Sequence, residues 1–242
     1  MFLKKLRLIK FFTYFLFLSF TFISSAKSSN INKQINENPT EDEIFEKLNS
    51  KLDLNLTFTN QNGKKESLKE ILADKKILIL TLNYFSCTTM CTFQFLNLSK
   101  ALQKMNWPIG KGFKIATISF DPKDTIENSK LLKENWSPKT GQKNAQWDFY
   151  VSTQENILSL TKQLNFYYKP DPEGETYSHV GALYFIKPDG TFYRYLYGIS
   201  YEAEDIKHAL IDTSDGDLGT FLEKLPLKFK KYQPKIGKYA PN

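Results

Sequence analysis

Sulfur and imidazole groups are scarce in this chain, which has two cysteines and two histidines among its 242 residues. The chain can therefore form one disulfide at most. It also lacks a glycine-rich phosphate-binding loop, a Ser/His/Asp catalytic arrangement and internal repeats. Its lysines are scattered, as on a solvated surface, and do not form a basic face interleaved with aromatic residues. We therefore expect no nucleic-acid partner.

Acidic residues are missing from the first 26 positions, although this stretch carries Lys and Arg before an apolar run at residues 11–23. That run is shorter than the roughly 20 residues of a typical membrane-spanning helix. The small residues Ser-Ser-Ala at 24–26 are typical of a signal-peptidase site. The pattern predicts a signal peptide or an N-terminal membrane anchor, with export of the rest of the chain and the basic end kept on the cytoplasmic side.

The remaining sequence has the composition of one folded domain with flanking segments. A hydrophobic content of 41% and an aromatic content of 15% can supply a full core. Residues 27–44 are rich in Ser, Asn, Lys and Glu, which predicts a flexible linker. We therefore expect a signal peptide or anchor at 1–26, a linker at 27–44, one domain at 45–213 and a C-terminal extension at 214–242.

Hydrophobic periodicity within the predicted domain indicates strands that alternate with helices. The expected strands lie at residues 52–58, 76–82, 113–120, 147–151, 180–186 and 191–197, and the expected helices at 90–105, 124–136, 152–164 and 201–213. This order implies parallel pairing, helices on both faces and a C-terminal antiparallel hairpin. The predicted fold class is α/β, a thioredoxin-like mixed sheet with one strand and one helix inserted after the first βα unit.

Cys87 and Cys91 lie between the strand predicted at 76–82 and the helix predicted at 90–105, at a strand end where functional groups collect in such sheets. Their spacing lets both sulfurs share one side of the helix, whose N-terminus favours thiolate. The pair can cycle between dithiol and disulfide or hold a soft metal such as Cu(I). A purely structural disulfide would close a very short loop and restrict the unfolded chain little.

His179 is the candidate third ligand. It directly precedes the strand predicted at 180–186, and in a thioredoxin-like fold that junction faces the cysteine loop. Two thiolates and one imidazole suit copper in either oxidation state, or zinc with a fourth ligand. The other histidine, His208, lies in the middle of a predicted helix, and we expect it to be a surface or half-buried residue.

Two aspartates and several aromatic residues near these positions have two readings. Asp121 and Asp124 can end a strand and cap a helix, with Asp124 or Thr125 as the cap, or they can form an acidic rim that orients a ligand or a partner. We expect core or pocket-wall positions for four aromatic residues, and the alternative is that they shield a metal or form a partner surface: Tyr84, Phe85, Tyr167 and Tyr168.

Several stretches of this sequence resemble the SCO/SenC family. They are LNYFSCTTMC at 82–91, ISFDPKDT at 118–125, SHVG at 178–181 and KPDG at 187–190, followed by RYLYGI at 194–199. The resemblance covers roughly residues 45 to 213, and its motifs occur in the order and spacing of the family.

The resemblance implies a membrane-tethered or exported copper chaperone that helps assemble the CuA centre of cytochrome c oxidase, by delivering copper or by reducing the target's cysteines. It assigns Cu(I) or Cu(II) to Cys87, Cys91 and His179. The implied partners are the copper-bearing oxidase subunit or another copper chaperone, and also the membrane if the N-terminal segment stays uncleaved. The implied location is the periplasmic face of the bacterial inner membrane, anchored or released.

The sequence also departs from the family pattern. Thr88 and Thr92 follow the cysteines where proline is common, and no acidic residue lies between Cys87 and Cys91. The alternative function is an extracytoplasmic thiol–disulfide oxidoreductase that uses these two cysteines as a redox dithiol without obligatory copper. A thiol peroxidase is a weaker third hypothesis. We expect a metallochaperone, with thiol reductase chemistry as the enzymatic alternative.

Overall fold

The structure is a computed structural model that describes residues 47–214, 230–233 and 237–241. These residues belong to one compact unit, residues 41–242. The predicted signal peptide or anchor at 1–26 and the linker at 27–44 lie outside the described residues, as does much of the extension at 214–242. Within the described ranges, no helix is long and apolar enough to cross a membrane.

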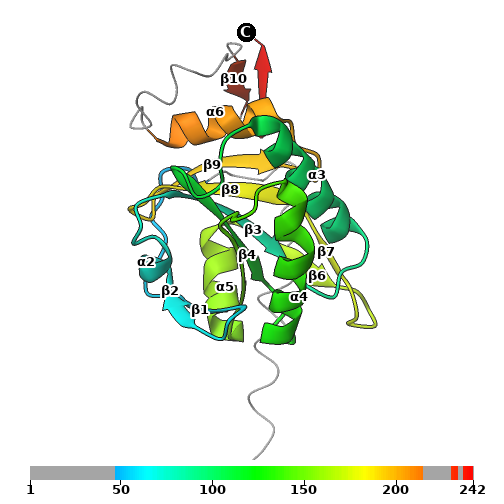
Figure 1. The fold of residues 1–242 in the computed structure, drawn as a ribbon. Coiled ribbons are helices and arrows are strands. Elements are labelled where there is room, and N and C mark those ends of the chain that lie inside the picture. Colours follow the sequence, from blue (N-terminus) through cyan, green and yellow to red (C-terminus); the bar gives the residue numbers. More distant parts are fainter. Residues whose placement is uncertain (1–46, 215–229, 234–236, 242) are drawn as a thin grey trace, which may run out of the picture. The chain divides into compact units, whose positions relative to one another are not determined.

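A mixed seven-stranded sheet forms the centre of this unit (Figure 1), with the strand order β2-β1-β5-β4-β3-β8-β9. Strands β3, β4 and β5 run parallel, and the other neighbours in the sheet pair antiparallel. The strands are β1 (Thr57–Asn60), β2 (Lys65–Ser67), β3 (Ile77–Asn83), β4 (Phe113–Ser119), β5 (Trp147–Val151), β8 (Ala182–Ile186) and β9 (Phe192–Tyr197).

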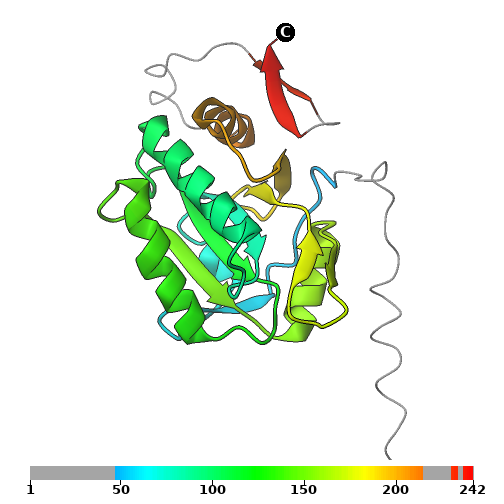
Figure 2. The same cartoon turned by 90° about the vertical axis from the view of Figure 1, so that its right-hand side faces the viewer.

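Helices cover both faces of the sheet. They are α2 (Leu68–Ile71), α3 (Met90–Met105), α4 (Ile126–Trp136), the 3-10 helix η1 (Ser137–Thr140), α5 (Gln154–Gln163) and α6 (Ala203–Thr213). Helices α3 and α4 lie side by side over one face and α5 covers the other (Figures 1 and 2). The units β3-α3-β4 and β4-α4-β5 step in the same direction along the sheet, so right-handed crossovers place α3 and α4 on the same face. The chain then returns from β5 to β8 in the opposite direction, and this places α5 on the other face.

Strand β3 places the functional loop. Every residue of β3 is buried, because the strand lies between β4 and β8 with helices on both faces. Its apolar side chains therefore form a continuous run, as the sequence predicted for residues 76–82. The chain leaves β3 at the carboxyl edge of the parallel strands, passes through residues 84–89 and enters α3.

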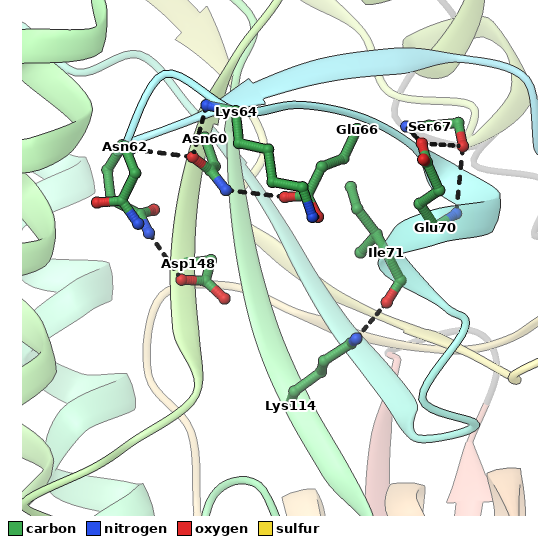
Figure 3. Close-up of polar contacts among 10 residues, drawn as sticks. Asn60, Asn62, Lys64, Glu66, Ser67, Glu70, Ile71, Lys114 and Asp148 are labelled. Carbon is green, nitrogen blue, oxygen red and sulfur yellow. Dashed lines mark hydrogen bonds and ion pairs between the residues drawn. The ribbon is translucent and has the colours of Figure 1, made fainter.

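After β1, a turn at residues 60–63 is held by the side chain of Asn60 (Figure 3). Its Oδ1 accepts hydrogen bonds from the backbone N–H groups of Asn62 (2.9 Å) and Lys64 (3.1 Å). Strand β2 and the short helix α2, which were not predicted, follow this turn. Ser67 and Glu70 form a capping box at the start of α2, a pattern that the sequence does contain.

The strand predicted at 52–58 is only partly correct, because β1 begins at Thr57. Asp53 Oδ1 accepts a hydrogen bond from the backbone N–H of Asn55 at 2.9 Å, and this local turn interrupts the extended backbone. Leu52 and Leu56 are nevertheless buried. The alternating pattern thus reports burial of an irregular segment rather than a strand.

A second small sheet was also missed. Strands β6 (Tyr168–Pro170) and β7 (Tyr177–His179) form an antiparallel hairpin between the helix expected at 152–164 and the strand expected at 180–186, where no strand was predicted. His179 therefore ends β7, and β8 begins only at Ala182. The hairpin carries His179 to the cysteine loop.

The described part of the C-terminal extension forms a hairpin of β10 (Lys230–Gln233) and β11 (Lys238–Pro241). Tyr239 donates a hydrogen bond to Asp212 at 2.5 Å, and its ring packs on His208 with centroids 5.2 Å apart. His208 is therefore buried, and the expectation of a surface or half-buried residue was wrong because β11 covers this part of α6.

Candidate functional site

Both cysteines lie where the chain passes from β3 into α3, and both are free thiols. Cys87 is half-buried in the loop, whereas Cys91 is 1% exposed in the first turn of the helix. The N-cap residue Thr89 makes no side-chain capping bond. Instead, Cys87 Sγ accepts a hydrogen bond from the backbone N–H of Cys91 at 3.4 Å. The sulfur of Cys87 therefore takes the place of a capping acceptor at the helix N-terminus.

His179 reaches the same place from the β6–β7 hairpin, which lies beside the start of α3 (Figure 2). Its Nε2 is 3.9 Å from Cys91 Sγ. Its Nδ1 is 3.3 Å from the carbonyl oxygen of Val180, which can only accept, so Nδ1 carries the proton. Nε2 therefore presents a lone pair to Cys91. Burial lowers the pKa of His179, which keeps the imidazole neutral and able to bind a metal.

Aromatic rings surround this imidazole. The ring centroids of Phe120, Phe166 and Tyr84 lie 5.0, 5.6 and 6.1 Å from that of His179. Tyr84 and Phe85 are buried and Tyr168 is half-buried, as predicted for a core or pocket wall. Tyr167 is 50% exposed, so its predicted place in the wall was wrong. Its hydroxyl donates to Asn165 instead.

The two thiols differ strongly in acidity. A hydrogen bond from the Cys91 thiol is the main cause that lowers the pKa of Cys87 to about 4, with further hydrogen bonds from Tyr84 and from backbone N–H groups. The same bond to Cys87 and burial raise the pKa of Cys91. The reduced pair therefore consists of one thiolate and one thiol, in which Cys87 is the accessible nucleophile.

Asp124 holds the loop that carries Cys87. Its Oδ2 accepts hydrogen bonds from the backbone N–H of Phe85 (2.7 Å) and from the Ser119 hydroxyl (2.5 Å). Burial raises the pKa of Asp124. The N-cap of α4 is Thr125, as one of the two predicted alternatives had it, and Asp124 does not cap that helix. Its contact with Phe85 spans 39 residues, so no local sequence pattern marks it.

Asp121 has a local role combined with one long-range contact. Its Oδ1 accepts from the backbone N–H of Lys123 at 2.9 Å, which is the predicted strand-end turn. Its carboxylate is also hydrogen bonded to the hydroxyl of Tyr177 in β7. Asp121 therefore helps to keep the His179-bearing hairpin against the end of β4.

The donor set fits a soft metal ion. The distance of 3.9 Å from Cys91 Sγ to His179 Nε2 is shorter than the about 4.3 Å that one metal–thiolate and one metal–imidazole bond span in line, so one ion can contact both. Two sulfurs and a neutral imidazole match the preferences of copper. Over the described ranges, no group of three or more His, Cys, Asp or Glu side chains is arranged to hold a metal ion. Ligation by Cys87, Cys91 and His179 together would therefore need these side chains to rearrange.

Known proteins share the sequence pattern and the fold of this chain. The SCO1/SenC family model matches residues 46–213. No curated protein matches the chain at a significant level. Solved structures that share its fold include a SCO1/SenC family lipoprotein from Bacillus anthracis str. Ames, with a TM-score of 0.57 and 23% identity over 70% of this chain and 96% of that chain.

Two further structures are similar. ScoI of Arabidopsis thaliana with copper bound has a TM-score of 0.55 and 17% identity, over 69% of this chain and 98% of that chain. BsSco, described as having a disulfide switch and as a member of the Sco family of cytochrome c oxidase assembly proteins, has a TM-score of 0.51 and 23% identity, over 70% of this chain and 96% of that chain.

The predicted α/β, thioredoxin-like fold is confirmed by the observed sheet and by these structural neighbours. The domain boundaries predicted at 26, 44 and 213 stay predictions. Because the family model covers more than half of the sequence, the chain belongs to the SCO1/SenC family.

Proposed function

We propose that this protein is an exported copper-binding chaperone that assists assembly of the CuA centre of cytochrome c oxidase, by copper delivery, by reduction of the target's cysteines, or by both. Membership in the SCO1/SenC family and copper-bound structures of similar proteins support a Sco-type copper-binding role in oxidase assembly. The observation that carries the proposal is the approach of His179 Nε2 to within 3.9 Å of Cys91 Sγ, beside a second cysteine.

In this proposal copper is the cargo, and Cys87, Cys91 and His179 are its ligands. The imidazole is kept neutral by burial, and its tautomer is set by Val180. Cys87 is the more exposed sulfur. A ligand of the client protein can therefore replace Cys87 first, while Cys91 and His179 still hold the ion.

The partner in this proposal is the copper-bearing subunit of the oxidase or another copper chaperone. The location is the periplasmic face of the bacterial inner membrane, anchored or released. Support for export comes from the basic and apolar pattern of residues 1–26. Cell fractionation of the full-length protein, with N-terminal sequencing of the product, tests both export and cleavage. Recovery in the cytoplasm with an intact N-terminus contradicts the proposed location.

Metal analysis tests the proposed ligands. The full-length protein, purified without oxygen, should hold one copper per chain, and a parallel count should find both thiols free before loading. Cys87→Ala, Cys91→Ala and His179→Ala should each reduce occupancy. His208→Ala is the matched control, because it removes the chain's other imidazole, which is far from the cysteines in sequence and packs on Tyr239. Full occupancy in the triple variant refutes the proposal.

A thiol–disulfide reductase is the second candidate, and the unequal acidity of the two cysteines favours it. Cys87 as thiolate can attack a client disulfide, and Cys91 can then displace the reduced client by forming the Cys87–Cys91 disulfide. Two electrons pass from the cysteine pair to the client. In a disulfide-reduction assay, a His179→Ala variant with unchanged turnover and no need for copper would identify the reductase as the main activity.

A further inference from the structure

Gln94 is a buried amide beside the point where the pairing of β3 with β8 ends. The two strands pair antiparallel up to Leu80 and Tyr184. Beyond that pair, β3 continues toward the cysteine loop, while β8 begins shortly after His179. Gln94 comes from α3 and is 1% exposed. A polar group so deeply buried costs free energy unless it is hydrogen bonded, so its partners show what it holds in place.

The amide of Gln94 joins the two strand ends. Its Nε2 donates to the carbonyl oxygen of Ala182, the first residue of β8, at 3.3 Å. Its Oε1 accepts from Nδ2 of Asn83, the last residue of β3, at 2.8 Å. A carbonyl oxygen can only accept, so Nε2 must face β8 and Oε1 must face β3. One side chain of α3 therefore connects the two strands where their own pairing has stopped.

A second route leads from the same amide to the segment that follows His179. Gln94 Nε2 also donates to Tyr201 Oη at 2.7 Å, and the Tyr201 hydroxyl donates to the carbonyl oxygen of Gly198 at 2.5 Å. The backbone N–H of Gly198 in turn donates to the carbonyl oxygen of Gly181 at 2.7 Å. Gln94 is thus tied to this segment both directly, through β8, and through the loop before α6.

The proposed metal ligands lie at the two ends of this bridge. Cys91 is one helical turn before Gln94 in α3, and His179 is three residues before Ala182. We infer that Gln94 is a positioning residue: its amide fixes the start of α3 against the start of β8, and this sets the 3.9 Å approach of His179 Nε2 to Cys91 Sγ. Ligands that are held loosely bind a metal less tightly. The inference rests on the proposed function for its copper readouts only.

The first test is Gln94→Leu, which removes the amide at similar volume. Competition with a chromogenic Cu(I) chelator should show binding about tenfold weaker than in the wild type. Gln103→Leu is the matched control, because it makes the same change near the other end of α3, where the Gln103 amide donates to the carbonyl oxygen of Lys139 at 2.7 Å. Its copper binding should be unchanged. No loss in Gln94→Leu, or an equal loss in Gln103→Leu, overturns the inference.

A double-mutant cycle separates positioning from a general structural role. If Gln94 acts by placing the imidazole, its removal should matter little once the imidazole is gone. In the His179→Ala background, Gln94→Leu should therefore weaken Cu(I) binding by less than about twofold. A loss of about tenfold in both backgrounds means that Gln94 acts on the fold as a whole, and it overturns the inference.

A further test needs no copper and separates this inference from the proposed function. In the reduced, metal-free wild type, a nuclear Overhauser contact should join the ring protons of His179 to the β protons of Cys91. The contact should persist in Gln103→Leu and weaken or vanish in Gln94→Leu. If the wild type binds no copper, the proposed function fails and this contact alone decides. A contact of equal intensity in Gln94→Leu then overturns the inference.

Tyr201→Phe keeps the inference testable if Gln94→Leu does not fold. This change removes only the hydroxyl that accepts from Gln94 and leaves the bonds of the amide to Ala182 and Asn83. The contact between His179 and Cys91 should weaken in the same direction by a smaller amount. An unchanged contact in a folded Tyr201→Phe variant overturns the inference.

Discussion

Replacement of Asp124 tests how the cysteine loop is held in place. The carboxylate joins the end of β4 to the loop, because its Oδ2 accepts from the Ser119 hydroxyl and from the backbone N–H of Phe85. In Asp124→Ala, the buried Phe85 N–H loses its acceptor. We therefore expect both lower stability and a looser position of Cys87.

The magnitude follows from the two contacts and the burial of the charge. A hydrogen bond to a charged group contributes about 1.5–3 kcal/mol, so two of them contribute about 3–6 kcal/mol. Burial of the carboxylate, which raises the pKa of Asp124, opposes this gain. We expect Asp124→Ala to lower the free energy of unfolding by about 2 kcal/mol. For a domain of this size, that corresponds to a fall in Tm of about 4–8 °C.

The assay is thermal unfolding of the reduced, metal-free protein at pH 7, together with the rate at which iodoacetamide alkylates Cys87. Asp124→Asn is the control, because its side-chain oxygen can still accept from Phe85, and it should stay within about 1 kcal/mol of the wild type. A Tm of Asp124→Ala within about 1 °C of the wild type, with unchanged alkylation of Cys87, refutes the reasoning.

Three further predictions concern pH, the thiol pair and the C-terminal hairpin. Burial raises the pKa of Asp124 in the folded state above its unfolded-state pKa of about 3.9. The stability of the wild type relative to Asp124→Asn should therefore fall as the pH rises from about 3.9 through the folded-state pKa. A stability difference between the two proteins that stays constant from pH 3 to 8 contradicts this. In Cys91→Ala, the pH midpoint of Cys87 alkylation should rise from about 4 toward the ordinary thiol pKa of about 8.5. A midpoint that does not move excludes the hydrogen bond from Cys91 as the cause of the low Cys87 pKa. A Cβ at Gly237 (φ +54°) would lie 1.8 Å from a tyrosine ring carbon, whereas Gly63 (φ +79°) has free space. Chemical denaturation should therefore show that the free energy of unfolding falls by about 3 kcal/mol in Gly237→Ala and by about 1 kcal/mol in Gly63→Ala. Equal losses in the two variants would show that the C-terminal hairpin does not pack against that tyrosine ring.

The sequence predicted the parts of the site that depend on local pattern. The buried run of β3, the start of α3 near residue 90 and the cysteine spacing together place both sulfurs at one strand end. The fold class then implies that His179 faces them, and the observed distance of 3.9 Å between His179 Nε2 and Cys91 Sγ agrees with that expectation. The role of these three residues as metal ligands stays a prediction.

One prediction failed for a local reason, and the others failed where distant segments decide the outcome. The strand expected at 52–58 fails because the Asp53 side chain turns the backbone locally. His208 is buried only because β11, from the C-terminal extension, covers it. Asp124 was expected to cap a helix or form a rim, and it holds the cysteine loop through a residue 39 positions earlier.

By itself, the sequence determined the order of the main strands and helices, the family and the reactive groups, because periodicity and spacing are properties of neighbouring residues. Only the tertiary structure decided the chemical state of those groups. The acidity of Cys87 and the tautomer of His179 each depend on a hydrogen bond whose direction is set by a particular neighbour.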